Sequence, residues 1–260
     1  MHKFKVAIIG GGNVAQHLIK QVTGAGHKLV QIYNRTLSSI SQTDTGFEAE
    51  KTNNIHELTQ DADIYIVCVK DYAIELVAKD IKLKDKLIIH TSGATSMDKL
   101  KSCSTQYGIF YPLQSFSKNL NIDFKSIPII IEANNTEGRA KLELFSKSIS
   151  DHVVYLNEAQ RIPIHIGGVF VNNFANRLFS LADTYLSSQQ LSFDLLKPLI
   201  LQTIEKLNFG SPSEMQTGPA MRGDKETIQI HINKLENNKE MQEIYKIMTD
   251  SILKSQLKTN

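Results

Sequence analysis

The stretch Val6-Ala7-Ile8-Ile9-Gly10-Gly11-Gly12-Asn13-Val14-Ala15 decides the fold of this chain. It predicts a buried strand that runs into a glycine turn, which in turn opens a helix. Gly10, Gly12 and Ala15 match the Gly-x-Gly-x-x-Ala fingerprint of dinucleotide-binding domains. The glycines let the backbone approach a pyrophosphate, which binds the free amides and positive dipole end of the helix. A tight turn alone could select glycine, but this context favours a dinucleotide site formed by Gly10, Gly12, Asn13 and Val14.

The end of the next predicted strand, over residues 28–33, indicates which dinucleotide is bound. Enzymes that use NAD usually place an Asp or Glu about twenty residues beyond the glycines, where it accepts hydrogen bonds from the ribose 2′-hydroxyl. No Asp or Glu occurs in this chain before Asp44. Asn34, Arg35 and Thr36 offer donors that suit a 2′-phosphate instead, so we expect NADP(H) rather than NAD(H). The alternative is that Arg35 is an ordinary exposed arginine.

Length and composition limit the class of protein. The chain has 260 residues, of which 41% are hydrophobic, so it can form two ordinary domains. Its formal net charge of +2 implies no nucleic-acid partner. No apolar run reaches membrane-spanning length, and the first strand leaves no room for a signal peptide, so we expect a cytoplasmic protein without a membrane partner. Cys68 and Cys103 lack metal-ligand spacing and are interpreted as core residues, so we predict no metal site.

The chain divides into two halves of different pattern. Up to about Leu156, short apolar strands alternate with helical segments, which is typical of an α/β fold with a doubly wound parallel sheet of Rossmann type. Beyond Glu158 the sequence predicts helices without a strand. We therefore predict a nucleotide-binding domain over residues 1–157 and an all-α domain over residues 158–260. The further strands are expected at 63–69, 86–90, 107–111, 127–132 and 152–156, and the helices from about 72 and at 136–149, 164–187, 193–208, from 211, 225–235 and 239–254.

Ligands of open parallel sheets bind outside the carboxyl ends of the strands, so these ends are candidate sites. Val69 and Lys70 follow one strand and are predicted to contact the cofactor. Ser92 and Gly93 follow the next and could hold a substrate carboxylate through hydroxyl and amide donors. The alternatives are structural: Asp71 could cap a solvated helix, and the hydroxyls of residues 90–93 could cap the helix near Met97. Pro112, after a later strand, is interpreted as a strand terminator.

The helix predicted over residues 164–187 has an unusual polar stripe. His165, Asn172, Asn176 and Asp183 follow one another at seven- and four-residue steps, opposite an apolar stripe that includes Val171. An exposed helix face is normally rich in Lys and Glu, so this stripe suggests burial against the first domain or another subunit. It either forms a structural hydrogen-bond network or lines the substrate site, in which case His165, Asn172 and Asn176 are candidate site residues.

A second candidate for substrate binding is the loop over residues 217–224. Its glycines and proline predict an irregular segment, and Arg222 could bind a carboxylate or phosphate through two parallel hydrogen bonds. The alternative is a plain helix–helix connection in which Arg222 pairs with Asp224. Asp224 is also a plausible N-cap of the helix that follows.

The motifs together resemble a known superfamily. The glycine motif with Asn34-Arg35-Thr36 is similar to that of NADP-binding reductases in the superfamily of 6-phosphogluconate dehydrogenase, ketopantoate reductase and pyrroline-5-carboxylate reductase. Over essentially its whole length the chain resembles a bacterial group of putative NADP oxidoreductases related to deazaflavin-dependent NADP reductases. The resemblance implies a cofactor between the two domains and a homodimer formed through the helical domain. It rests on the segments His90–Gly93, Tyr111–Phe116, Gly168–Asn173, Thr217–Pro219 and Arg222–Asp224.

One position departs from the superfamily. Ketopantoate reductase and related enzymes carry a lysine at the start of the long second-domain helix, followed by an asparagine, to move the carbonyl proton. Here the region carries His165 and Asn172 without a lysine. Histidine can act as an acid and a base near neutral pH.

We therefore expect an NADP(H)-dependent oxidoreductase that acts on a small carbonyl, imine or hydroxy-acid compound bearing a carboxylate. Ser92, Asn172 and Arg222 would hold the substrate, and His165 or water would supply the proton, while Lys70 and Ser92 lie near the nicotinamide. Two alternatives stay open. The chain could be a non-catalytic sensor or scaffold that binds NADP(H), or a reductase whose hydride partner is a deazaflavin.

Overall fold

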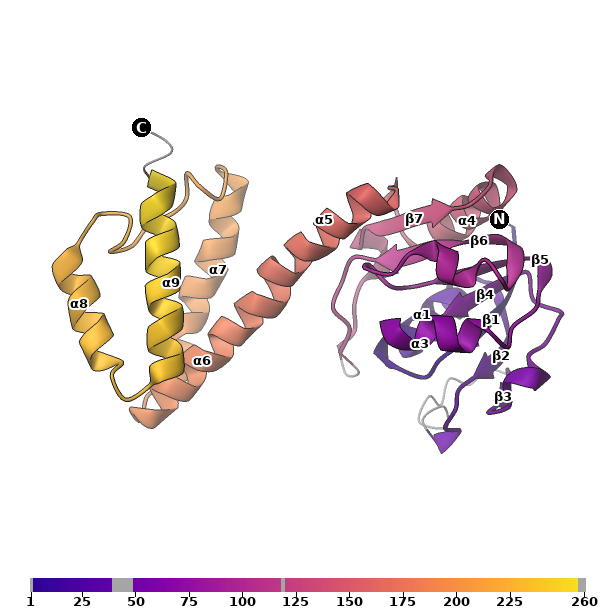
Figure 1. Ribbon diagram of the computed structural model, residues 1–260, viewed down its shortest axis with the longest axis horizontal. Helices are drawn as coiled ribbons and strands as arrows, with labels where there is room; N and C mark the ends of the chain where they lie inside the picture. The colour runs from indigo at the N-terminus through magenta and orange to yellow at the C-terminus, as the bar shows by residue number, and fades with distance from the viewer. Residues whose placement is uncertain (1, 39–48, 118–119, 257–260) are drawn as a thin grey trace. The chain divides into compact units, whose positions relative to one another are not determined.

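A computed structural model of the chain describes residues 2–38, 49–117 and 120–256. The described strands form one sheet in the order β3-β2-β1-β4-β5-β6-β7-β8 (Figure 1). The first six positions, read from β3, follow the strand order of a Rossmann domain, so the predicted fold class is confirmed. The strands are β1 (Lys5–Ile9), β2 (Lys28–Tyr33), β3 (Glu50–Thr52), β4 (Ile64–Val67), β5 (Lys84–His90), β6 (Ser104–Pro112), β7 (Ile129–Ala133) and β8 (Val153–Tyr155).

The sheet is mostly parallel rather than wholly parallel. β7 pairs with β6 in the antiparallel direction, with Tyr111 opposite Ile130, and β8 then runs parallel to β7. The connection from β6 to β7 contains only the short 3₁₀ helix η3 (Phe124–Ser126) among its described residues, whereas parallel neighbours need a crossover. The carboxyl ends of β1, β4, β5 and β6 still meet at one edge of the sheet, because these four strands are parallel.

Alternate residues of the strands serve two separate cores. Val6 and Ile8 of β1 pack in one cluster with Leu18, whereas Ala7 and Ile9 pack in the other with Ile74. The helices α1 (Asn13–Gly24) and α4 (Thr136–Ile149) contribute to the first cluster, and α3 (Asp71–Ala78) and the 3₁₀ helix η2 (Met97–Leu100) contribute to the second. The sheet is therefore covered on both faces, as a doubly wound fold requires.

The described residues divide into two compact units. Unit 1 comprises residues up to Asn173, and unit 2 begins at Phe174. The first helix after the sheet, α5 (Glu158–Gly168), and most of the π-helical segment η4 (Val169–Phe174) belong to unit 1. The domain boundary predicted near residue 157 coincides with the start of α5 and stays a prediction.

Unit 2 is entirely helical where the structure describes it. Its members are α6 (Ala175–Ser188), η5 (Phe193–Leu196), α7 (Lys197–Glu205), η6 (Lys206–Asn208), α8 (Lys225–Lys234) and α9 (Lys239–Gln256). Arg177 of α6 and Glu240 of α9 form an ion pair at 2.6 Å, and His231 of α8 and Tyr245 of α9 form a hydrogen bond at 2.9 Å. No helix in the described ranges is long and apolar enough to cross a membrane.

Several predicted helix limits need correction. The long helix begins at Glu158 rather than Ile164, because Asn157 and Gln160 form a capping box ahead of Pro163. The segment that starts at Ser211 is a turn rather than a helix, although Glu214 accepts hydrogen bonds from the Ser211 amide and hydroxyl. Asp224 caps α8 as expected by accepting from the amide of Thr227 at 3.0 Å. The 3₁₀ helix η1 (Ile55–Glu57) and strand β3 are additional to the predicted elements.

Candidate active site

The first glycine of the turn is required by the fold itself. Gly10 has a φ of +128°, which side chains rarely adopt, and a Cβ at this position would collide with the carbonyl oxygen of Cys68. The amide of Gly10 donates to the Tyr33 carbonyl at 2.7 Å, and the amide of Cys68 donates to the Ile9 carbonyl at 2.7 Å. Gly10 therefore lies where the carboxyl ends of β1, β2 and β4 meet.

The third glycine leaves space for a ligand. Gly12 caps α1 with an extended backbone that any residue could adopt, and no described atom lies within 4 Å of where its Cβ would stand. The first turn of α1 contains no acidic residue, and no side chain caps it in the described structure. The amides at this helix end are thus open to an anion. The cradle fits the pyrophosphate of a dinucleotide, with Asn13 and Val14 as the next amides.

The side chain of Asn13 has a structural partner. Its amide donates to the Phe116 carbonyl at 2.8 Å, and His17 one turn later contacts the Ser117 carbonyl at 3.0 Å. These bonds fix the segment that follows β6 beside the start of α1. The side chain of Asn13 is therefore engaged, and the group that Asn13 could offer to a cofactor is its backbone amide.

The residues predicted to recognise the 2′-phosphate lie beside the glycine turn. The side chain of Asn34 stands against Gly11, at 3.0 Å from a Cβ built there, and donates to the Thr36 carbonyl at 2.9 Å. Arg35 and Thr36 are exposed. Val69 lies on the other side of the turn, with its Cγ1 3.4 Å from a Cβ built on Gly10, and Lys70 is the exposed N-cap residue of α3. Asp71 is the first residue of α3 and not its cap.

The Ser92 hydroxyl is committed to its own turn. It donates to Thr95 Oγ1 at 3.0 Å and accepts from the amides of Ala94 and Thr95 at 3.2 and 3.0 Å. His90 is buried beneath this turn, where its Nδ1 accepts from the Ser92 amide at 3.2 Å. Burial lowers the pKa of His90 to about 4, so its ring is neutral near pH 7. The cap of η2 is Ser96, so the structural alternative, in which hydroxyls of residues 90–93 cap this helix, is wrong.

A tyrosine and a histidine meet above Gly93. Tyr111 Oη at the end of β6 and His165 Nδ1 on α5 lie 3.0 Å apart and form a hydrogen bond. A Cβ on Gly93 would stand 2.5 Å from His165 Nδ1 and 2.6 Å from Tyr111 Cζ, so the two rings occupy the space that a side chain would need. Burial raises the pKa of Tyr111, and the charge of Arg161 opposes that rise. The Tyr111 hydroxyl and the His165 ring are therefore paired as donor and acceptor, and the tautomer of the histidine decides which of them donates.

A buried arginine anchors this part of α5 to the loop after β5. Arg161 is fully buried, and its Nη1 donates to the Gly93 carbonyl at 2.6 Å. Its Nη2 lies 3.4 Å from Glu132 and 3.8 Å from Glu158, while Nε has no partner among the described atoms. Burial raises the pKa of Glu132, and the adjacent Arg161 opposes the rise. Because Arg161 lies one helical turn before His165, the bond to Gly93 helps to fix the histidine.

These groups border a cavity of about 580 Å³ at the carboxyl edge of the sheet, within the usual size range of small-molecule sites. Every lining residue belongs to unit 1. Residues from α3, the loop after β5, β6 and its following loop, α5 and η4 contribute to it. They are Asp71, Thr91, Ser92, Gly93, Tyr111, Leu113, Gln114, Ser115, Ile164, His165, Gly168, Val169, Val171, Asn172 and Asn173.

The cavity unites four predicted site residues from different parts of the sequence, Ser92, Gly93, His165 and Asn172. Asn176 and Arg222 belong to unit 2, so their part in substrate binding stays a prediction. In unit 2, Asp224 uses its carboxylate to cap α8, and the nearby Arg222 helps to lower the pKa of Asp224. Tyr111 and Asp71 lie at predicted strand ends that were candidate sites, but neither was selected as a site residue from the sequence. Arg161 carried no sequence signal that would distinguish it from an exposed arginine.

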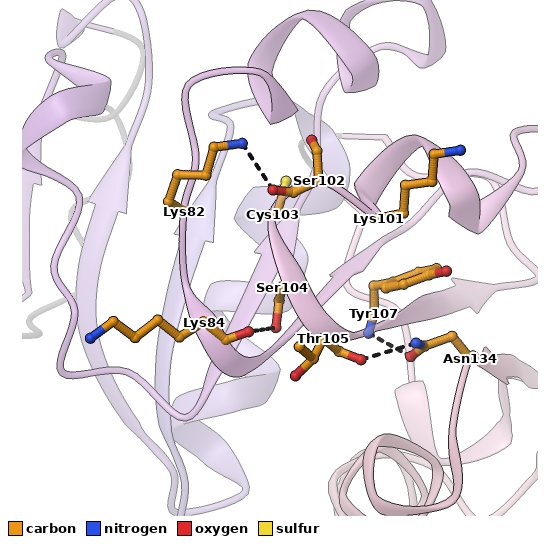
Figure 2. A pocket seen from close by; sticks show the side chains of 9 residues that line it. All are labelled: Lys82, Lys84, Lys101, Ser102, Cys103, Ser104, Thr105, Tyr107 and Asn134. Carbon is orange, nitrogen blue, oxygen red and sulfur yellow. Dashed lines mark hydrogen bonds between the residues drawn. The ribbon is translucent and has the colours of Figure 1, made fainter.

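A second hollow, of about 560 Å³, lies at the opposite edge of the sheet, beside the amino ends of β5 and β6 (Figure 2). Its polar groups largely satisfy one another: Lys82 donates to the Ser102 carbonyl at 2.9 Å, and Asn134 exchanges hydrogen bonds with Tyr107 and Thr105. Cys103 in its wall is buried, and burial raises its pKa. Ligands of parallel sheets bind at the carboxyl edge, so we assign the chemistry to the first cavity. The described residues contain no group of three or more His, Cys, Asp or Glu that could hold a metal ion.

Comparison with known proteins gives two family matches. Residues 5–93 match the family described as NADP oxidoreductase, coenzyme F420-dependent, and residues 127–252 match a domain of unknown function, DUF2520. The chain is 36% identical to a solved structure from Bacteroides fragilis that is described as a putative NADP oxidoreductase. The two structures superpose with a TM-score of 0.91, and the match covers 97% of this chain and 98% of that chain. No curated protein matches the sequence.

More distant solved structures share the fold. A 1-pyrroline-5-carboxylate reductase from Streptococcus pyogenes is 14% identical, with a TM-score of 0.64 and coverage of 97% of this chain and 99% of that chain. A reductive aminase from Aspergillus terreus, in complex with NADPH and ethyl levulinate, is 15% identical, with a TM-score of 0.61. The match covers 90% of this chain and 78% of that chain. The resemblance of the architecture to the pyrroline-5-carboxylate reductase superfamily is thereby confirmed.

Proposed function

We propose that the chain, which belongs to the family of the Bacteroides fragilis putative NADP oxidoreductase, is an NADP(H)-dependent oxidoreductase. It would transfer a hydride between NADP(H) and a small carbonyl, imine or hydroxy-acid compound in the cavity of unit 1. The observation that carries the proposal is the hydrogen bond between Tyr111 and His165 on the wall of this cavity. A reductase of C=O or C=N bonds needs a proton donor near the acceptor of the hydride, and this pair supplies one.

The glycine turn supports cofactor binding through its open helix end. Gly12 offers room for a pyrophosphate, and Arg35 offers a charged donor to the 2′-phosphate beside it. When bound, NADPH would supply the hydride that reduces the substrate. Val69 and Lys70 connect the glycine turn with the cavity along the chain. Val69 lies beside Gly10, and Lys70 directly precedes Asp71, which lines the cavity.

The protein's own residues would manage the proton. With His165 neutral at Nδ1, the Tyr111 hydroxyl donates to the imidazole; with His165 protonated, the imidazole donates to the phenol oxygen. In the second arrangement the phenol hydroxyl is free, so Tyr111 can present its proton to a substrate oxygen or nitrogen while His165 replaces it. This arrangement fills the place of the lysine expected in ketopantoate reductase. Asn172 would orient the substrate, and the turn of Ser92 would shape the wall beside Gly93.

An open cavity bordered by Ser92 and His165 supports catalysis over the alternative of a non-catalytic sensor. A sensor would gain nothing from a proton donor with a titratable partner beside an accessible space. The deazaflavin alternative would need a wide apolar opening, whereas the walls here mix amides, hydroxyls and aliphatic side chains.

The cofactor assignment is tested by thermal unfolding in the presence of NADPH, NADP, NADH and NAD. A ligand that binds only the folded state raises the midpoint by an amount set by its affinity. We expect NADPH to raise it most, and Arg35→Ala to weaken NADPH about tenfold or more while leaving NADH unchanged. Equal stabilisation of the natural chain by NADH and NADPH would contradict the role of Arg35.

The proton-donor assignment is tested by NADPH oxidation over a panel of small carbonyls and imines. Tyr111→Phe and His165→Ala should each lower kcat about 100-fold, with NADPH affinity unchanged. Tyr107→Phe removes a hydroxyl from the same strand but outside the cavity and serves as the matched control. Full turnover by both cavity variants would refute the assignment.

A homodimer formed through unit 2 is the second part of the proposal. Large apolar side chains of this unit are exposed in the single chain, among them Leu195 at 70%, Leu199 at 58%, Ile204 at 60% and Phe209 at 84%. The buried hydrophobic residues described in unit 2 are Leu181, Ala220 and Leu235, which is a small core for its length. A second copy can cover the exposed side chains, since such an extensive apolar surface normally marks an interface.

Light scattering tests this arrangement. The natural chain should have twice its mass of 29.2 kDa. The double substitution Leu199→Glu with Ile204→Glu should shift the chain towards the monomer, whereas Leu76→Glu, at an exposed leucine of unit 1, should not. A monomeric natural chain would contradict the proposed dimer.

A further inference from the structure

The charge of the active-site cavity restricts the substrate. Among the described residues that line it, Asp71 is the one carboxylate, and none is Lys or Arg. The nearest buried cation, Arg161, already bonds to the Gly93 carbonyl and faces Glu132, so it is not available to an anionic substrate. The cavity is therefore suited to a cation, and its described lining offers a carboxylate no lysine or arginine as a counter-ion.

The uncharged part of the wall indicates the rest of the ligand. Leu113, Ile164, Val169 and Val171 present aliphatic surface, while Asn172 and Gln114 provide amide groups that can accept a hydrogen bond. Such a wall accommodates a small hydrocarbon skeleton with one polar nitrogen. A carboxylate on the same skeleton would lie against these groups without a lysine or arginine partner.

The expectation of a carboxylate-bearing substrate depended on Arg222 and on the hydroxyl and amide donors of Ser92 and Gly93. The Ser92 hydroxyl is engaged within its own turn. Arg222 belongs to unit 2, whereas every residue that lines the cavity belongs to unit 1. The carboxylate with which a cationic nitrogen in this cavity could pair is Asp71, at the first position of α3. An acidic residue in the first helical turn also stabilises the helix, so the test must separate this role from ligand binding.

We propose that the site takes a protonated aliphatic imine without a carboxylate, and returns the corresponding amine, with Asp71 as the counter-ion of the nitrogen in both. This inference rests on the proposed function and names its substrate class. In the reduction, the imine carbon receives a hydride from NADPH, and the electron pair of the C=N bond moves to nitrogen. The nitrogen already bears its proton, so the product is a neutral amine. It becomes an ammonium ion when Tyr111 donates a proton, which His165 replaces.

The experiment compares matched five-membered rings with the full-length chain and NADPH. The substrates are 1-pyrroline, 1-pyrroline-5-carboxylate and cyclopentanone, which differ in the carboxylate and in the charge of the reacting group. We expect kcat/KM for 1-pyrroline to exceed the other two by tenfold or more. Asp71→Asn should lower that value about tenfold through KM, and Asp80→Asn, which removes an exposed carboxylate outside the cavity, should not.

Binding of the products gives a second readout that does not require turnover. In the presence of NADP, pyrrolidine should raise the unfolding midpoint of the natural chain more than proline or cyclopentanol does. Asp71→Asn should abolish this difference while its own midpoint without ligand stays within a few degrees of the natural chain. A lower midpoint with the pyrrolidine effect retained would show that Asp71 only stabilises α3, and would overturn the proposal.

The remaining outcomes are also decisive. Preference for 1-pyrroline-5-carboxylate or cyclopentanone, in turnover or in binding of their products, would overturn the imine inference and leave the oxidoreductase proposal intact. Absence of turnover together with equal effects of pyrrolidine, proline and cyclopentanol would overturn it as well. Failure of NADPH and NADP to stabilise the chain would instead refute the proposed function itself.

Discussion

Replacement of Gly93 by alanine should separate the two rings at the centre of the cavity. The new methyl group would stand 2.5 Å from His165 Nδ1 and 2.6 Å from Tyr111 Cζ, whereas ordinary carbon contacts lie at about 3.5–4.0 Å. Each ring must therefore withdraw by about 1 Å, or the loop after β5 must move by that amount. The Tyr111–His165 distance of 3.0 Å cannot survive such a displacement as a hydrogen bond.

The expected cost has two sources. Overpacking of a fitted site costs about 1–3 kcal/mol, and the lost hydrogen bond adds about 1 kcal/mol. We expect Gly93→Ala to lower the free energy of unfolding by about 2–4 kcal/mol. Turnover should fall about 100-fold, because a catalytic group displaced by about 1 Å loses its alignment. NADPH binding at Gly12, on a different loop, should be unchanged.

Urea unfolding followed by circular dichroism measures the stability difference. Gly167→Ala is the matched control, because it lies on α5 and no described atom is within 4 Å of its Cβ position. Alanine in a helix is favoured over glycine by about 0.5–1 kcal/mol, so the control should be slightly more stable than the natural chain. If Gly93→Ala unfolds at the same urea concentration as the natural chain, the rings of Tyr111 and His165 are not packed against Gly93.

Three further outcomes follow from the buried groups and the glycine turn. Because the pKa of His90 is about 4 in the fold against an ordinary value of 6.5, the unfolded chain binds more protons between these values. Stability should therefore fall by about 3 kcal/mol as the pH drops from 6.5 to 4, and His90→Gln should reduce this slope in urea titrations at several pH values. Arg161→Met should destabilise the chain by about 3–5 kcal/mol, because it leaves Glu132 without its cation. The double variant with Glu132→Leu should recover most of this loss in urea unfolding. Equal stabilities of the single and double variants would exclude the ion pair as the cause. Gly12→Ala should change the stability by less than about 1 kcal/mol yet abolish stabilisation by NADPH, as thermal unfolding can measure.

Much of unit 1 could be predicted because its strands are short apolar runs with clear limits. The run Val6–Ile9 and the glycines after it determine a buried strand, a sharp turn and a helix, whatever the rest of the chain does. The cap of α8 was equally readable, since Asp224 accepts from the amide of Thr227, three residues later. These features depend on neighbours in sequence, so no long-range information was needed.

The direction of β7 and the presence of β3 were not predictable in this way. An apolar run such as residues 127–132 is buried equally well in either direction, and direction depends on the path of the connection. Glu50–Thr52 is a short edge strand without an apolar pattern. Pro163 obscured the start of α5, although the capping box of Asn157 and Gln160 marked it.

The active-site pair illustrates a further limit. Tyr111 and His165 are 54 positions apart, and nothing in the spacing of either segment links them. Polar periodicity identified His165 and Asn172 as members of one helix face, but the partner of the histidine depends on where α5 packs. That packing rests on Arg161, whose buried position follows from its bond to Gly93 and not from its sequence context.

The two outer glycines of the turn have different consequences for a cell. Substitution of Gly10 would force the backbones of β1 and β4 apart, so less folded protein would accumulate and degradation would increase. Substitution of Gly12 would leave the amount of protein almost unchanged and remove its ligand. Quality control would therefore eliminate variants at the first position, whereas variants at the third would persist as abundant chains that, under the proposed function, no longer bind NADP(H).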